Sequence, residues 1–164
     1  MTKKPRTPIK TKALQNLWWD WLGTAERLLN LLHEQGVALM TRNFPKVEKI
    51  QNELNGIIAR MHQIDQHATL VARKLAVELG GKPNLKSLLT HLEEKEASQM
   101  KTMIQRIKTV GKNLKERLYT NRTLLENELN YIHGTLTLMA KTASEQQNLY
   151  GKQSQTPFLM DQTA

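Results

Sequence analysis

The chain has 164 residues and a formal net charge of +9, and 39% of its residues are apolar. With three Trp, three Tyr and two Phe it can bury the seams of packed helices, but it is poorly supplied for a thick globular core. It contains no cysteine, which excludes a disulfide framework, thiolate chemistry and a cysteine-based zinc site.

The first twelve residues hold more than half of the net charge. The cations there are Lys3, Lys4, Arg6, Lys10 and Lys12. Such a basic arm acts as a solubilising tail or binds a phosphate backbone. We favour the tail and expect no nucleic-acid partner. Asp20 and Glu26 interrupt the apolar residues that follow, and no apolar run approaches the ~18 residues that span a bilayer. We therefore expect a cytoplasmic protein without a signal peptide or membrane insertion.

A first helix is predicted over residues 13–40. Its seam, with steps that alternate between four and three, consists of Leu14, Trp18, Trp21, Ala25, Leu28, Leu32, Gln35 and Leu39. Trp18 and Trp21 share this seam, whereas Trp19 does not. We interpret the tryptophans as packing at one end of a helical hairpin, with an exposed binding hot spot as the alternative.

The second helix, over residues 44–79, has the most regular pattern. It is preceded by "TRNFP", in which Asn43 is a plausible N-cap and Pro45 suits a first helical turn. Its seam positions are all apolar and have the spacing of a coiled coil or bundle: Val47, Ile50, Leu54, Ile57, Met61, Ile64, Ala68, Val71 and Leu75. "GGKPN" ends it, because Gly80 supplies a left-handed C-cap and Pro83 prevents continuation. A short helix over residues 85–92 follows, with Asn84 as its cap.

A very long final helix is predicted over residues 97–146, with Glu93, Glu94 and Glu96 near its start, where the helix dipole favours negative charge. Its seam consists of Met100, Ile104, Ile107, Gly111, Leu114, Leu118, Asn121, Leu125, Leu129, Ile132, Leu136, Met139 and Ala143. Asn121 is a candidate register-setting polar residue.

The lengths of the helices predict an uncovered surface. At 1.5 Å per residue the three main helices measure roughly 40, 55 and 75 Å, so the last one outruns its neighbours. We expect its apolar residues between 125 and 143 to lack cover within the chain, which usually marks a binding surface. The alternative is cover by the tail, by the short helix or by a second subunit in a homo-oligomer.

Together these elements predict an all-α fold: an elongated antiparallel helical hairpin or bundle with one very long C-terminal helix and a short connecting helix. We expect a basic flexible arm over residues 1–12, a helical bundle domain over 13–146 and a flexible tail over 147–164.

No catalytic or metal-binding pattern is present. The histidines do not form a His-Glu-x-x-His motif, and His62 and His67 diverge on a helix. "LGGKPN" lacks the glycine spacing and the Ser or Thr of a phosphate loop. No nucleophile has an identifiable base beside it. We therefore expect no enzyme, no metal and no cofactor.

Four cations recur every seven residues beside the seam of the final helix. We name them the basic edge: Lys101, Lys108, Lys115 and Arg122. We expect them to pair with acids on a neighbouring helix. The alternatives are an acidic segment of a partner protein or nucleic acid, although the shortage of interleaved aromatics, with Tyr119 alone nearby, argues against stacked single strands.

Three stretches give the chain a family likeness. They are "LLHEQGVALMTRNFPKVEKIQNELNGII", "NRTLLENELNYIHGTLTLM", and the Tyr150-Gly151 step in a polar tail. In this order, and with the short helix after "GGKPN", the chain resembles the FlgN family of flagellar export chaperones over about residues 14 to 161. The resemblance assigns no role to the basic N-terminal extension or to the "PFLMD" ending.

The resemblance implies a cytosolic, non-catalytic helical chaperone of type III flagellar export. Its clients would be hook-associated proteins of the hook–filament junction, held by a C-terminal helical segment. The client groove would be formed by Leu124, Leu125, Leu129, Ile132, Leu136 and Met139, with Leu138 beside them. Tyr150 would dock at the cytoplasmic domain of the export gate. The tail is then either this second docking peptide or a plug in which Phe158, Leu159 and Met160 cover the empty groove. A non-flagellar coiled-coil adaptor or scaffold is the alternative function.

Overall fold

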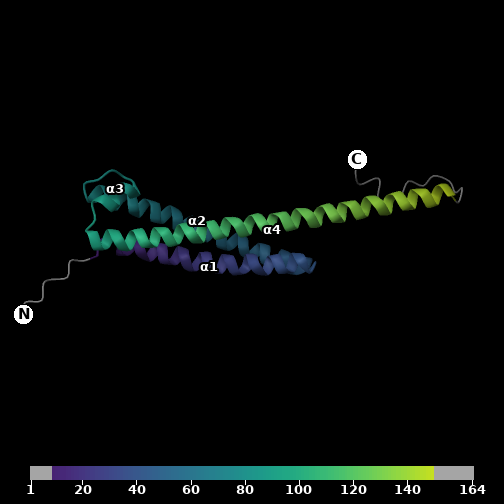
Figure 1. The fold of residues 1–164 in the computed structure, drawn as a ribbon, viewed down its shortest axis with the longest axis horizontal. Coiled ribbons are helices and arrows are strands. Elements are labelled where there is room, and N and C mark those ends of the chain that lie inside the picture. Colours follow the sequence, from purple (N-terminus) through teal and green to yellow (C-terminus); the bar gives the residue numbers. More distant parts are fainter. Residues whose placement is uncertain (1–8, 150–164) are drawn as a thin grey trace, which may run out of the picture. The chain divides into compact units, whose positions relative to one another are not determined.

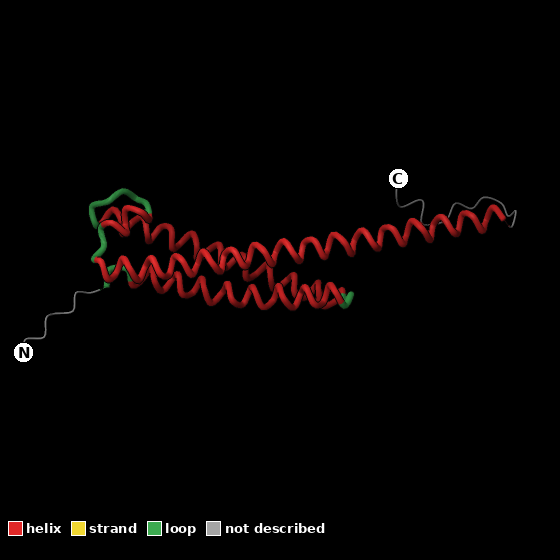
Figure 2. The backbone as a smooth tube through the Cα atoms, in the orientation of Figure 1, coloured by secondary structure: helices red, strands yellow, loops and turns green. Residues whose placement is uncertain are grey.

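The computed structural model of the chain describes residues 9–149, and these consist of four α-helices joined by turns (Figure 1). The helices are α1 (Lys12–Met40), α2 (Phe44–Glu78), α3 (Leu85–Thr90) and α4 (Glu94–Leu149). Figure 2 shows helix and loop throughout the described range, without a strand. The predicted all-α fold class with a long C-terminal helix and a short connecting helix is therefore confirmed. The observed α4 starts and ends three residues outside the predicted 97–146.

The chain divides into two compact units, Met1–Asn121 and Arg122–Ala164, with the boundary inside α4. Unit 1 contains α1, α2, α3 and the first part of α4. The described part of unit 2 is the remainder of α4. Most of the expected N-terminal arm and the expected tail from residue 150 onward lie outside the described residues.

The turns of unit 1 follow from a few residues with special backbone roles. Gly80 has a φ of 86°, and its N–H donates to the carbonyl of Val77, while the N–H of Gly81 donates to the carbonyl of Ala76. This pair of bonds is the Schellman arrangement, which ends α2 as predicted. The two predicted asparagine caps are also present: Asn43 accepts from the N–H of Lys46, and Asn84 accepts from the N–H of Ser87.

The predicted seams of α1 and α2 form the buried faces of unit 1. One core cluster joins all three long helices: Ala25, Leu28, Leu32, Ile50, Leu54, Ile57 and Leu114. A second cluster also includes α3: Leu14, Ala68, Ala72, Ala76, Leu88 and Met100. Trp18 packs against the second cluster and Trp21 against the first, both half-buried, so the packing interpretation of these two tryptophans is confirmed.

Polar contacts fix the first part of α4 at one end to Thr11, the N-cap residue of α1, and at the other end to α1 itself. The carboxylate of Glu96 accepts hydrogen bonds from the backbone N–H and the hydroxyl of Thr11, at 2.7 and 2.6 Å. The Nδ2 of Asn121 donates to the carbonyl of Leu32 at 2.6 Å and to the Oε1 of Gln35 at 3.2 Å. Asn121, which we predicted to set the register, is therefore a buried cross-helix contact, with 4% of its surface exposed.

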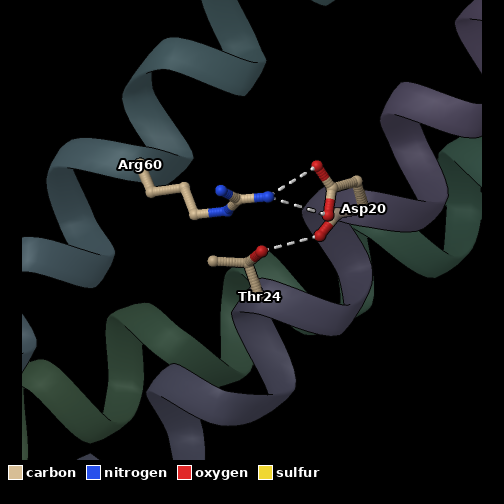
Figure 3. A network of polar contacts seen from close by, with 3 residues as sticks. All are labelled: Asp20, Thr24 and Arg60. Atoms are coloured by element: carbon tan, nitrogen blue, oxygen red, sulfur yellow. Dashed lines mark hydrogen bonds and ion pairs between the residues drawn. The ribbon is translucent and has the colours of Figure 1, made fainter.

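A surface ion pair joins α1 and α2 (Figure 3). The guanidinium of Arg60 lies 3.2 Å from the carboxylate of Asp20, and the hydroxyl of Thr24 donates to the backbone carbonyl of Asp20. Both charged side chains are about half exposed, so the pair contributes less than about 1 kcal/mol to stability. Apolar burial therefore accounts for most of the attachment between these helices.

Candidate partner-binding site

The described part of unit 2 presents an apolar stripe along α4. We define the apolar stripe as Leu125, Leu129, Ile132, Leu136 and Met139, which follow one another at steps of four and three. This spacing places them on one side of the helix. All five side chains are exposed, from 39% for Ile132 to 60% for Met139. The stretch that the sequence predicted to lack cover is thus exposed.

The other predicted site residues differ in their surroundings. Leu138 is exposed, whereas Leu124 is half-buried. Tyr150 and the tail cluster Phe158, Leu159 and Met160 lie outside the described residues. Leu124 and the five stripe residues therefore lie on one helix, α4. The predicted docking residue Tyr150 is not among the described residues.

Several polar side chains in the part of α4 that carries the stripe make contacts within the helix. The hydroxyls of Thr135, Thr137 and Thr142 each donate to the carbonyl four residues earlier, at 2.9 to 3.0 Å. Arg122 donates to Glu126 at 2.8 Å, and this hydrogen bond and the charge of Glu126 raise the pKa of Arg122. The Arg122–Glu126 pair stabilises the helix slightly, whereas threonine hydroxyls bonded to the carbonyl four residues earlier do not strengthen it. None of these contacts covers the apolar stripe.

The basic edge does not pair as predicted. Arg122 pairs with Glu126 on its own helix and not with a neighbouring one. No ion pair joins Lys101, Lys108 or Lys115 to a carboxylate in the part of the chain that the structure describes. The prediction of pairing across helices was therefore wrong, because heptad spacing aligns cations on one side of α4 without placing acids opposite them.

Trp19 is the exposed member of the tryptophan cluster. About half of its surface, 51%, is accessible, and the guanidinium of Arg106 lies 5.3 Å from the centre of its ring. Arg106 also approaches the carboxylate of Glu26 at 3.7 Å. A cation–π contact at an exposed site contributes about 0.5–1 kcal/mol, so these contacts explain the position of Trp19 within unit 1.

None of the helices in residues 9–149 is long and apolar enough to cross a membrane. Within the same residues, no three His, Asp or Glu side chains are grouped so that they can hold a metal ion.

Comparison with known proteins gives one result for nearly the whole chain. A family model described as "FlgN protein" matches residues 1–157. The match includes the basic N-terminal extension, whereas the resemblance described under Sequence analysis began at about residue 14. The match ends just before Phe158. Neither the curated proteins nor the solved structures contain a significant match.

Proposed function

The chain belongs to the FlgN family of flagellar export chaperones, and from this premise we propose that its apolar stripe holds the C-terminal segment of hook-associated proteins before their export. The observation that carries the proposal is the exposure of five large apolar side chains in one row on α4. Monomeric proteins rarely expose such a row unless it binds a partner.

The spacing of the stripe suits a helical partner. Steps of four and three let the knobs of a second amphipathic helix fit between the stripe residues. A client segment that is disordered before assembly must be ordered on binding, and this entropy cost lowers its affinity. We therefore expect dissociation constants between about micromolar and tens of nanomolar, which allow the client to be released. Met139 adds a flexible side chain that can adapt to more than one client.

Delivery is the second part of the proposal. A chaperone that keeps its client from aggregating must also reach the export apparatus. We assign this contact to Tyr150, which would dock at the cytoplasmic domain of the export gate, as the family resemblance implies. Because Tyr150 follows the apolar stripe in sequence, the two contacts are made by different residues and can be separated by mutation.

The client proposal is tested by a matched pair of substitutions. Leu129→Asp introduces a charge into the stripe, and we expect it to weaken binding of a hook-associated protein's C-terminal peptide at least about tenfold, because the apolar contact is replaced by a desolvated carboxylate. Asn130→Asp introduces the same charge at an exposed position that points away from the stripe, and we expect less than about a twofold change. Isothermal titration calorimetry with the full chain measures both.

The outcomes separate the proposed function from its alternative. Equal weakening by both variants would mean that charge alone matters and that the stripe is not the site. No binding of any hook-associated C-terminal peptide, together with capture of an unrelated coiled coil, would support the non-flagellar adaptor. If the molecular mass of the chain rises with its concentration and Leu129→Asp abolishes this rise, the stripe would be the interface of a homo-oligomer.

The gate proposal has its own readout. We expect Tyr150→Ala to weaken binding to the purified cytoplasmic domain of the export gate and to leave client affinity unchanged. Deletion of residues 157–164 tests the plug hypothesis, because removal of a competing segment raises client affinity. If both variants leave gate and client affinities unchanged, neither role of the tail is retained.

A further inference from the structure

Unit 1 contains a groove that the predicted function does not use. It has a volume of about 480 Å³ and lies among α1, α2, α4 and the turn before α3. Its apolar wall consists of Trp18, Ala68, Ala72, Leu85, Ile104 and Ile107. All of these residues belong to unit 1, so the groove is separate from the apolar stripe of unit 2.

The groove arises from a change of residue size along α2. The first part of the α2 seam carries large side chains such as Ile50 and Leu54, which are almost fully buried. Farther along, the buried positions are Ala68, Ala72 and Ala76. Alanine fills less of the space between helices, so Ile104 and Ile107 of α4 remain only half-buried on this side. The seam is apolar here but incompletely filled.

The rim of the groove is basic. Arg73 from α2 and Lys108 from α4 line it, against a single carboxylate, Asp65. No ion pair engages any of these three side chains within residues 9–149. Lys108 is also the second of the four members of the basic edge.

The basic edge extends this charge along α4. Lys101 and Lys115 lie one heptad before and after Lys108, and seven residues return almost to the same side of a helix. The three lysines therefore form a row about 21 Å long in unit 1. The groove is apolar and is bordered by regularly spaced cations. It therefore complements an amphipathic helix that carries acidic residues beside its apolar side.

The geometry points to a second docking site in unit 1, which accepts an acidic amphipathic helix of a partner protein along the groove and the three lysines of the basic edge. Two or three apolar side chains of the partner fill the space above Ala68 and Ala72. Its carboxylates face Arg73 and the lysines of the basic edge. This site does not depend on client binding at the stripe, so one chain can hold two partners at once.

Two other occupants fit the observations less well. Nucleic acid would satisfy the cations but would leave Ile104 and Ile107 uncovered, and Trp18 is a half-buried part of the wall and not a free stacking surface. A second copy of the chain is disfavoured because its net charge of +9 opposes a basic rim.

The test uses labelled helical peptides of about 18 residues, long enough to span the lysine row. The probe carries leucines at steps of four and three, with glutamates at heptad spacing beside them. Two matched peptides replace the glutamates by lysine or the leucines by serine. Binding is measured by fluorescence anisotropy with the full chain carrying Leu129→Asp and Leu136→Asp, so that the apolar stripe does not contribute.

We expect the acidic probe to bind with a dissociation constant on the order of 10–100 µM, and both matched peptides to bind at least about tenfold more weakly. The double variant Arg73→Glu, Lys108→Glu should weaken the probe about tenfold or more. Thr69→Phe changes an exposed position in the groove lining. It should weaken binding of the probe to a similar extent, because it fills the groove without changing the charge. Circular dichroism checks that each variant keeps its helix content.

The matched control is Lys46→Glu, Lys49→Glu, which makes the same change of charge elsewhere on α2, at two exposed positions. We expect less than about a twofold effect, because rim charges act locally at physiological ionic strength. Three results would each overturn the proposal. The control could weaken the probe as much as Arg73→Glu, Lys108→Glu does, Thr69→Phe could leave the affinity for the probe unchanged, or the acidic probe could fail to bind below 1 mM. The proposal would also be overturned if a DNA duplex bound the chain and Lys108→Glu abolished that binding. It would be overturned as well if the chain formed dimers that Thr69→Phe dissociated.

Discussion

The two parts of α4 carry the same apolar spacing in opposite surroundings. In unit 1 its seam includes Met100 and Leu114, of which 0% and 6% of the surface is exposed. In unit 2 the seam continues as the apolar stripe, in which Leu129 is 57% exposed. Helical periodicity thus determines which side of a helix is apolar, but a neighbouring element decides whether that side is core or binding surface.

The polar contacts of the two parts differ in the same way. In unit 1, α4 is joined to α1 by Glu96 at one end and by Asn121 at the other. In unit 2 the Arg122–Glu126 pair and the threonine hydrogen bonds connect α4 to itself. The first part is therefore stabilised by tertiary structure, and the second relies on helix propensity and on the partners that we propose.

The largest expected effect comes from one truncation made in each part. Leu114→Ala removes a buried side chain and should lower the free energy of unfolding by about 2–5 kcal/mol. Leu129→Ala removes an exposed one and should change it by less than about 0.5 kcal/mol. Urea unfolding followed by tryptophan fluorescence reports on unit 1 alone, because Trp18, Trp19 and Trp21 all lie in α1. Similar losses for the two variants would contradict the comparison.

A smaller effect is expected where α4 begins. Glu96→Ala removes the acceptor of two hydrogen bonds and leaves the backbone N–H and the hydroxyl hydrogen of the fully buried Thr11 without an acceptor, so we expect a loss of about 1–3 kcal/mol. Glu96→Gln keeps an oxygen acceptor but loses the charge assistance, and should cost about half as much. Glu94→Ala, at an exposed position in the same turn, is the control and should cost less than about 0.5 kcal/mol. Equal losses for Glu94 and Glu96 would mean that the helix dipole, and not the contact to Thr11, is responsible.

Much of the fold could be predicted because its signals are local. The turn at Gly80, the caps Asn43 and Asn84, and the seams of α1 and α2 each depend on residues close together in the sequence. The contact between Glu96 and Thr11 spans 85 residues and leaves no periodic trace. The buried alanines Ala72 and Ala76 were also missed, since alanine is compatible with either side of a helix.

The candidate sites were predictable to different degrees. The apolar stripe follows from spacing and helix length, both of which the sequence contains. The groove of unit 1 depends on three helices meeting at small residues, and its one sequence signal is the replacement of large residues by alanine at steps of four in α2. Pairing of the basic edge could not be predicted, because charge spacing on one helix carries no information about which side chains a neighbour places opposite it.

The hydrogen bond from Asn121 to Leu32, where the unit 1 part of α4 ends, allows a sharper test of the comparison. A Cβ added at Gly36 would lie 3.1 Å from the Oδ1 of Asn121, whose Nδ2 is held by the carbonyl of Leu32. We expect Gly36→Ala to destabilise unit 1 by up to about 1 kcal/mol, although alanine has the higher helix propensity. In an Asn121→Ala background the same change should stabilise by about 0.5–1 kcal/mol. A double-mutant cycle by urea unfolding measures the coupling. Additive effects would show that the two residues do not touch in solution.

The smallest effect compares two exposed glycines, one in each unit. An added Cβ meets nothing within 4 Å at Gly56 or at Gly134, so alanine at either position should gain roughly 0.5–1 kcal/mol of helix stability. Gly56→Ala should raise the unfolding free energy reported by the tryptophans, because α2 unfolds together with unit 1. Gly134→Ala should leave that value unchanged and instead slow amide hydrogen exchange around residue 134 by up to about fivefold, because this part of α4 opens locally. If Gly134→Ala raises the tryptophan-reported stability as much as Gly56→Ala does, the two parts of α4 unfold as one, and the stripe belongs to the cooperative core of the protein.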